Sequence, residues 1–240
     1  MLLVPWLIGM LLAHRAGVLS APRVLLGPAW LLGYLSFNAA SLWAKSPASR
    51  RARHVSPMAT YALLALVIGA AAVILGGFGI LWWAPIGAVL VGLTLWLVAH
   101  RRERSLLSGV VSVLAGAGVG VVTRWWSPLE LEAAPATDLA MLALTMAYFV
   151  GTVPVVKTMI RERGSRVWVA GSTMYHLALF AAAGLCFGAG WIGVLWILWA
   201  VLCLLRAALE PRWAARFTPM HVGLVEIGLS ALLLLCALLG

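Results

Sequence analysis

The chain has 240 residues, of which 64% are hydrophobic and only 10% are charged. Soluble domains have roughly 45–50% apolar and about 25% charged residues, so this composition excludes an ordinary soluble protein and indicates a polytopic protein of the lipid bilayer. The formal net charge of +10 would favour a nucleic-acid partner in a soluble protein. Here the basic residues lie in short segments between apolar stretches. We therefore expect them to set membrane orientation, and we expect no nucleic acid to bind.

The apolar stretches predict nine helices. The first, residues 1–13, is shorter than the roughly 20 residues that a spanning helix needs, and we interpret it as a first helix whose cytoplasmic turn is missing. None of the later stretches shows the alternation of a transmembrane β-strand. They cover residues 22–44, 58–76, 80–100, 105–124, 137–158, 167–187, 189–208 and 221–239. The predicted fold is all-α, a single integral membrane domain over residues 1–240 with nine transmembrane helices.

The basic residues predict the orientation of these helices. Fourteen of the 17 Lys and Arg residues lie in four segments, KSPASRRARH, HRRERS, KTMIRERGSR and RAALEPRWAARF. Short loops rich in Lys and Arg face the cytoplasm, so the N-terminus is expected inside and the C-terminus outside. The expected location is the bacterial cytoplasmic membrane, which the chain crosses several times.

Asn38, Lys157, His176 and Glu226 are polar residues within or at the ends of predicted helices. Such residues are costly in a bilayer and need partners, which makes each of them a candidate for a functional site. All four lie at or inside the half of the membrane that we assign to the cytoplasm, so we expect a polar cavity that opens there. The bases expected at its mouth are Lys45, Arg101, Arg102, Arg104, Lys157, Arg161 and Arg163. Simpler explanations stay open, because topology alone accounts for loop bases and a helical His often bonds a neighbouring backbone group.

The densest basic cluster follows the helix predicted at residues 137–158. Pro154 is expected to free a backbone carbonyl one turn earlier and to kink this helix. If the helix continues, Lys157, Arg161 and Gly164 fall on one face at i, i+4 and i+7. The pattern predicts a fixed set of cations at the membrane face, suited to an anionic partner.

Several catalytic motifs are absent from the sequence, including a phosphate-binding GxxxxGK[ST] loop, HExxH and GxSxG. The acids on the expected cytoplasmic side are few: Glu103, Glu162, Glu210 and Glu226. A magnesium site is therefore poorly supported, since Mg²⁺ prefers oxygen ligands. The sequence does not identify a cofactor, and magnesium is considered only by analogy.

The sequence resembles the YwiC-like family of bacterial membrane proteins. The matching segments are WLLGYLSFNAASLWAKS, HRRERSLLSGVVSVLA, AYFVGTVPVVKTMIRERGSR, YHLALF and VGLVEIGLSALLLL. They occur in order across nearly the whole chain. Members of this family usually begin with a His-Gly-Ala-Trp-Ala segment before the first helix, which agrees with a first helix that lacks its opening turn here.

A more distant likeness is to the UbiA-type prenyltransferases, which share nine helices, an inside N-terminus and functional loops after helices 2 and 6. This resemblance implies a UbiA-like helical bundle that takes an isoprenyl diphosphate with Mg²⁺ bound by Asp-rich motifs. The first motif keeps only Asn38, and its acids are replaced by Ala39, Leu42 and Ser46. The second is replaced by KTMIRERG, where Glu162 is the only acid. The resemblance therefore implies a similar helical scaffold, whereas the metal-dependent chemistry does not follow from it. Basic residues could contact a phosphate directly.

Three functions are compatible with these observations. The leading hypothesis is a protein that binds or transfers a membrane lipid or isoprenoid-type anion. The head group is expected near Arg101, Arg104, Lys157, Arg161 and Arg163, and Asn38, His176 and Glu226 are expected deeper in the cavity. Lys45 and Glu162 complete the predicted binding residues. The second is a small-solute permease, favoured by the Pro/Gly-interrupted helix at residues 137–158. The third is a non-catalytic membrane partner, for instance of a respiratory complex. Enzyme activity is left undecided.

Overall fold

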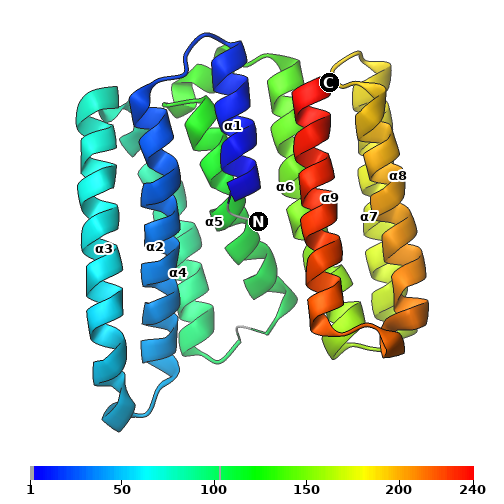
Figure 1. The fold of residues 1–240 in the computed structure, drawn as a ribbon, viewed down its shortest axis with the longest axis horizontal. Helices are drawn as coiled ribbons and strands as arrows, with labels where there is room; N and C mark the ends of the chain where they lie inside the picture. Colours follow the sequence, from blue (N-terminus) through cyan, green and yellow to red (C-terminus); the bar gives the residue numbers. More distant parts are fainter. Residues whose placement is uncertain (1–2, 103) are drawn as a thin grey trace. The chain divides into compact units, whose positions relative to one another are not determined.

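The computed structural model describes residues 3–102 and 104–240, with backbone only for 214–216. Every regular element in these residues is helical (Figure 1). The chain divides into two compact units, which we call the N-terminal unit, up to Ala133, and the C-terminal unit, Ala134–Gly240. The all-α prediction is confirmed for the described chain, whereas the single-domain prediction stays a prediction.

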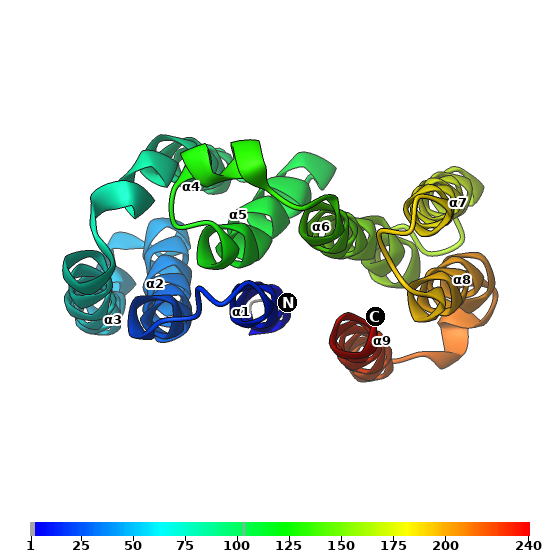
Figure 2. The ribbon, with the colours of Figure 1, turned by 90° about the horizontal axis from the view of Figure 1, so that it is seen from above.

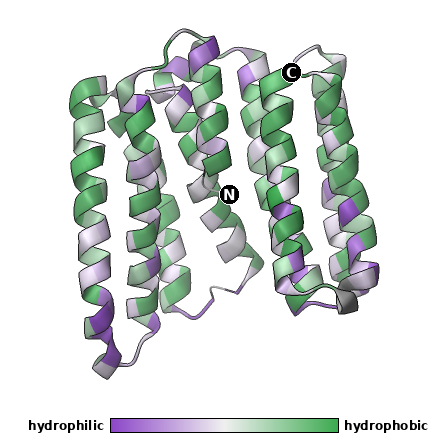
Figure 3. Cartoon of the chain, in the orientation of Figure 1, coloured by the Kyte–Doolittle hydropathy of each residue, from purple (hydrophilic) through white to green (hydrophobic). Residues whose placement is uncertain are grey.

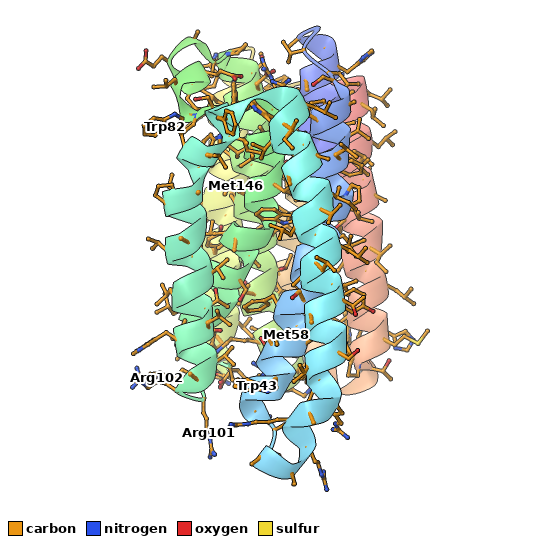
Figure 4. The ribbon with its side chains drawn as sticks, turned by 90° about the vertical axis from the view of Figure 1, so that its left-hand side faces the viewer. Trp43, Met58, Trp82, Arg101, Arg102 and Met146 are labelled. Atoms are coloured by element: carbon orange, nitrogen blue, oxygen red, sulfur yellow. The ribbon has the colours of Figure 1, made fainter. Side chains whose placement is uncertain are left out.

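The N-terminal unit contains five α-helices and two short 3₁₀ helices. Their bounds are α1 Leu3–Arg15, α2 Ala21–Lys45, α3 Ala48–Gly76, η1 Phe78–Trp83, α4 Ala84–Ala99, α5 Leu106–Arg124 and η2 Pro128–Ala133. Within this unit α2 pairs with α3, and α5 packs against α1 and α4 (Figure 2). The basic turn with Arg101 and Arg102 lies at the same end as Trp43, and Trp82 lies at the opposite end (Figure 4).

The C-terminal unit contains four α-helices, a π-helical turn and a short 3₁₀ helix. Their bounds are α6 Ala136–Val156, η3 Lys157–Arg161, α7 Arg166–Gly188, α8 Val194–Leu209, η4 Glu210–Arg216 and α9 Pro219–Leu239. Helix α6 packs against α7 and α9, and α8 packs against the same two helices (Figure 2). The turns η3 and η4 meet at one end of this unit, which brings two of the predicted basic segments together.

Eight of the described helices are long and apolar enough to cross a membrane, and α1, with 13 residues, is shorter. This confirms the prediction of a multi-pass membrane protein and most of the predicted boundaries. The largest difference is at α3, which begins at Ala48 rather than near residue 58. Its 29 residues would extend about 43 Å at 1.5 Å per residue, beyond the roughly 30 Å hydrocarbon layer. The basic residues 50–54 therefore form helical turns outside the hydrocarbon, visible as the hydrophilic end of α3 (Figure 3).

Small residues set the closest helix approach in the N-terminal unit. A Cβ added at Gly9 of α1 would lie 2.4 Å from the carbonyl oxygen of Gly120 in α5. Only glycine permits this contact, because a backbone oxygen cannot move aside as a side chain can. Close helix approach through small residues is typical of membrane helices, and Gly9 and Gly120 provide it here.

Arg23 fixes the opposite end of this unit from the basic turns. Its Nε donates to the carbonyl of Thr123 at 3.0 Å, and its Nη1 donates to the carbonyl of Val18 at 2.8 Å. The guanidinium lies 5.7 Å from the Trp126 ring centroid, and Nη2 is 3.9 Å from a Glu130 carboxylate oxygen. Several elements are thereby tied together by one side chain that satisfies backbone carbonyls.

Candidate functional site

The end of α6 does not follow the predicted geometry. The helix continues past Pro154 to Val156 and then widens into the π turn η3, in which the Glu162 amide donates to the carbonyl of Lys157 at 2.7 Å. The chain leaves the helix at Glu162, and Gly164 has φ +83°. The prediction that Lys157, Arg161 and Gly164 share one helical face is therefore wrong, because the widened turn ends the helix before Gly164 is reached.

Lys157 is buried, although it belongs to a basic segment that was predicted to lie at the membrane face. Its side chain points onto α7, where the ammonium nitrogen is 4.5 Å from the centroid of the Trp168 ring. Thr158 and Met159, the next two residues of the π turn, are also buried. In contrast, Arg161 is exposed and Glu162 is partly exposed. The π turn thus separates one buried cation from an exposed neighbour.

Arg163 has a structural contact at this end of the C-terminal unit. Its Nε donates to the carbonyl of Met159 at 3.0 Å, and its Nη2 donates to the carbonyl of Phe217 at 3.5 Å. These contacts tie the π turn to the segment before α9. Carbonyls at the end of a helical segment have no intrahelical partner, and Arg163 satisfies one of them.

A second group of polar residues lies deeper in the C-terminal unit, and we call it the polar cluster. It comprises Tyr148 of α6, His176 of α7, Arg206 of α8, Glu210 at the start of η4 and Glu226 of α9. Arg206 Nη2 donates to Glu226 Oε1 at 2.7 Å, and the Tyr148 hydroxyl donates to Glu226 Oε2 at 3.0 Å. Arg206 Nε lies 3.6 Å from Glu210 Oε2, an ion pair that is too long for a hydrogen bond. All four α-helices of the unit contribute to this cluster.

The cluster is buried and incompletely hydrogen-bonded. Arg206 is 7% exposed and Glu210 is 9% exposed. Arg206 Nε and Nη1 and Glu210 Oε2 have no hydrogen-bond partner within the described chain. Buried polar atoms of native proteins nearly always have partners, so unfilled donors beside an unfilled acceptor indicate a place where a proton, water or ligand binds.

His176 is 1% exposed and lies at a close approach of two helices. Its Nδ1 is 2.8 Å from the carbonyl of Ser172, and because a carbonyl only accepts, Nδ1 carries the hydrogen. Its Nε2 has no hydrogen-bond partner in the described residues and faces Gly151, where an added Cβ would lie 3.0 Å away. The backbone bond fits the simpler explanation given above for this His, and the free Nε2 leaves one acceptor position open.

The comparisons with known proteins add a family. The model of the YwiC-like protein family matches residues 1–124. The chain belongs to the YwiC-like protein family. Searches among curated proteins and among solved structures found no significant match. The family match ends with α5, so the polar cluster and the π turn of this YwiC-like protein lie outside the matched residues.

The remaining predicted site residues of this YwiC-like chain lie in the N-terminal unit. Asn38 and Lys45 are exposed on the last turns of α2. Arg101 and Arg104 are exposed in the turn between α4 and α5, where Arg101 has φ +56°. The other six predicted residues belong to the C-terminal unit, where His176 and Glu226 join the polar cluster. No group of three or more His, Cys, Asp or Glu residues suited to a metal occurs in the described residues.

Sequence reasoning missed Tyr148, Arg206 and Glu210 as site residues. Arg206 was interpreted as a basic residue that sets orientation, because it lies at the end of a predicted span. One signal was available: Arg206 and Glu210 are four residues apart, which is the spacing of an ion pair on one helix face. Such a pair at the end of an apolar run predicts a charge that stays paired in the membrane.

Proposed function

We propose that this YwiC-like protein binds a lipidic anion, such as an isoprenoid phosphate, by its head group at the end of α6. The side chain of Lys157, which is 9% exposed, carries the proposal. Among the described residues its ammonium contacts the Trp168 ring, and no carboxylate forms an ion pair with it. A largely buried lysine without an anionic partner is unfavourable, so a phosphate oxygen would supply the missing charge.

The surroundings of Lys157 support a ligand with an apolar tail. The π turn is flanked by apolar helices long enough to span a bilayer, so a tail can lie in lipid while the head group contacts the base. Arg161, exposed on the same turn, offers a second cation. Within this proposal the chain keeps a UbiA-like scaffold, an inside N-terminus and a bacterial cytoplasmic membrane location. The proposal covers binding, because the described donors do not fit a magnesium-dependent transfer.

Binding of farnesyl monophosphate to the purified protein in nanodiscs tests this function. The loss of one charged contact costs about 1.5–3 kcal/mol, so Lys157→Met should weaken binding roughly 10- to 100-fold, and Arg161→Met should weaken it less. Arg50→Met, at an exposed base of α3 in the N-terminal unit, is the matched control and should bind like the parent. Farnesol and inorganic phosphate, tested separately, distinguish tail recognition from phosphate recognition. Unchanged affinity in both Lys157→Met and Lys157→Glu would overturn the proposal.

The polar cluster favours a second function, a small-solute permease. Ionisable residues that pair inside a membrane bundle often line substrate or ion pathways. Glu226 bonds residues of two other helices, so its loss would alter the cluster as a whole. Uptake of candidate solutes into proteoliposomes that is abolished by Glu226→Gln, but retained by the exposed control Glu132→Gln, would support a permease. Equal uptake by Glu226→Gln and the parent would count against it.

A further inference from the structure

The charges of the polar cluster do not balance when both carboxylates are ionised. It contains one guanidinium, Arg206, and two carboxylates, Glu210 and Glu226. The nearest other buried cation of the unit, Lys157, has its ammonium over Trp168 instead. A net negative charge would then be buried in a helix bundle of the membrane. Both carboxylates lie close to the same guanidinium, at 3.6 Å and 2.7 Å, so they repel each other in a site of low dielectric constant, and one added proton is favoured.

The hydrogen bonds distinguish the two carboxylates. Glu226 accepts one bond on each oxygen, from Arg206 at 2.7 Å and from Tyr148 at 3.0 Å, which is the pattern of an ionised carboxylate. Glu210 Oε2 is buried and accepts none in the described chain. The charges that act on Glu210 are those of Arg206 on α8 and Glu226 on α9. The other charged or titratable side chains described on the elements around it are Arg212 on η4, Cys203 on α8, His221 and Cys236 on α9, Tyr148 and Asp138 on α6, Arg166, Tyr175, His176 and Cys186 on α7, and Lys157 and Arg161 on η3. Of the cations among them, only Arg206 forms an ion pair with Glu210 in the described residues, and that pair is long.

We propose that the polar cluster is a binding site for one exchangeable proton, which resides on Glu210 while Glu226 stays ionised against Arg206. The Nη1 of Arg206, which is buried and has no hydrogen-bond partner in the described residues, is a second observation that polar groups of this cluster lack a partner. The proposal does not depend on the binding of a lipidic anion, and it does not require transport.

The positions of the two carboxylates along their helices give the site a direction. Glu210 directly follows the last residue of α8, whereas Glu226 lies seven residues after the start of α9, about 10 Å along the helix axis. Because η4 connects α8 to α9, the end of α8 and the start of α9 lie at the same end of the unit. Glu210 is thus the outer and Glu226 the inner carboxylate, with Arg206 between them. A proton that enters at this end reaches Glu210 first.

Infrared spectroscopy of the protein in nanodiscs tests the proton directly, because a protonated carboxyl group has a carbonyl band that a carboxylate lacks. At neutral pH the parent should show one such band from a buried group, with slow deuterium exchange. Glu210→Gln should remove the band. Glu226→Gln should remove it as well, because Glu210 then becomes the sole partner of Arg206 and ionises. Glu132→Gln, at an exposed acid of the N-terminal unit, is the control and should retain the band.

Each alternative result overturns the proposal. A parent without the band has both carboxylates ionised, with any bound proton on another group such as His176. If the band persists in Glu210→Gln, the proton resides on another group. If the band is lost in Glu210→Gln but persists in Glu226→Gln, the proton on Glu210 is not explained by the charge balance with Arg206. The parent spectrum alone decides the first point, so the test does not depend on the folding of any variant.

Discussion

Two arginines, Arg23 in the N-terminal unit and Arg206 in the C-terminal unit, lie among transmembrane helices and differ in what surrounds them. Arg23 donates mainly to backbone carbonyls and stacks near Trp126. Arg206 faces two carboxylates and leaves two of its nitrogens unfilled in the described chain. A guanidinium satisfied mainly by carbonyls fixes the positions of helices, and the carboxylate near Arg23, that of Glu130, is 42% exposed to solvent. A guanidinium between carboxylates has partners that can gain or lose a proton, so the net charge around it can change.

The largest expected effect comes from Arg206→Met. It leaves Glu210 and Glu226 buried without a cation, and breaking a buried pair in this way costs about 3–5 kcal/mol. The free energy of unfolding, measured in mixed detergent micelles, should fall by this amount. A triple variant that also carries Glu210→Gln and Glu226→Gln should recover most of the loss. A loss below about 1 kcal/mol in the single variant would show that the cluster is solvated rather than buried.

Arg23→Met should cost less, because it removes hydrogen bonds to neutral carbonyls. Charged hydrogen bonds contribute about 1.5–3 kcal/mol, and the same unfolding measurement should give a loss in this range. The loss should be equal at different pH values near neutrality, unlike that of Arg206→Met, whose carboxylates take up protons. A pH-dependent loss at Arg23 would remove the contrast between the two arginines.

Gly9→Ala tests whether the N-terminal unit depends on backbone contact. The added methyl group would lie 2.4 Å from the Gly120 carbonyl oxygen, so α1 and α5 must separate, at a cost of about 1–3 kcal/mol. Gly118→Ala, where no neighbouring atom lies within 4 Å, is the control on α5 and should be close to neutral. Thermal unfolding of the two variants provides the comparison, and equal melting temperatures would contradict the close α1–α5 contact.

The smallest expected effect concerns the contact between Tyr148 and Glu226. A double-mutant cycle with Tyr148→Phe and Glu226→Gln should give a coupling energy of about 0.5–1 kcal/mol, from unfolding free energies of the parent, the two single variants and the double variant. Exact additivity would mean that the 3.0 Å hydrogen bond contributes nothing to the order of the cluster.

The positions of the helices could be predicted from the sequence, because helix length in a bilayer follows from the apolar runs. The early start of α3 was missed because its first turns, with Arg50, Arg51 and Arg53, are too polar to count as a span although they are helical. The faces that helices present to each other do not follow from hydropathy. Glu226 was singled out as an acid within a helix, and it is partly buried. Its partners Arg206, 20 residues away, and Tyr148, 78 residues away, are on other helices, and only packing brings them together.

The π turn also changes the rotational phase of its helix. A π-helical turn accommodates about one residue more than an α-helical turn, and one residue corresponds to about 100° of rotation. Before the turn, the rotation of α6 about its axis points Tyr148 at α9. After the turn, the residues are rotated about that axis relative to a regular α-helix. Deleting one residue from η3 would restore a regular α-helix and rotate everything that follows, up to the start of α7, relative to Tyr148. The orientation of the segment after η3, which includes Arg163, relative to Tyr148 is therefore set by the number of residues in the π turn as well as by their identity.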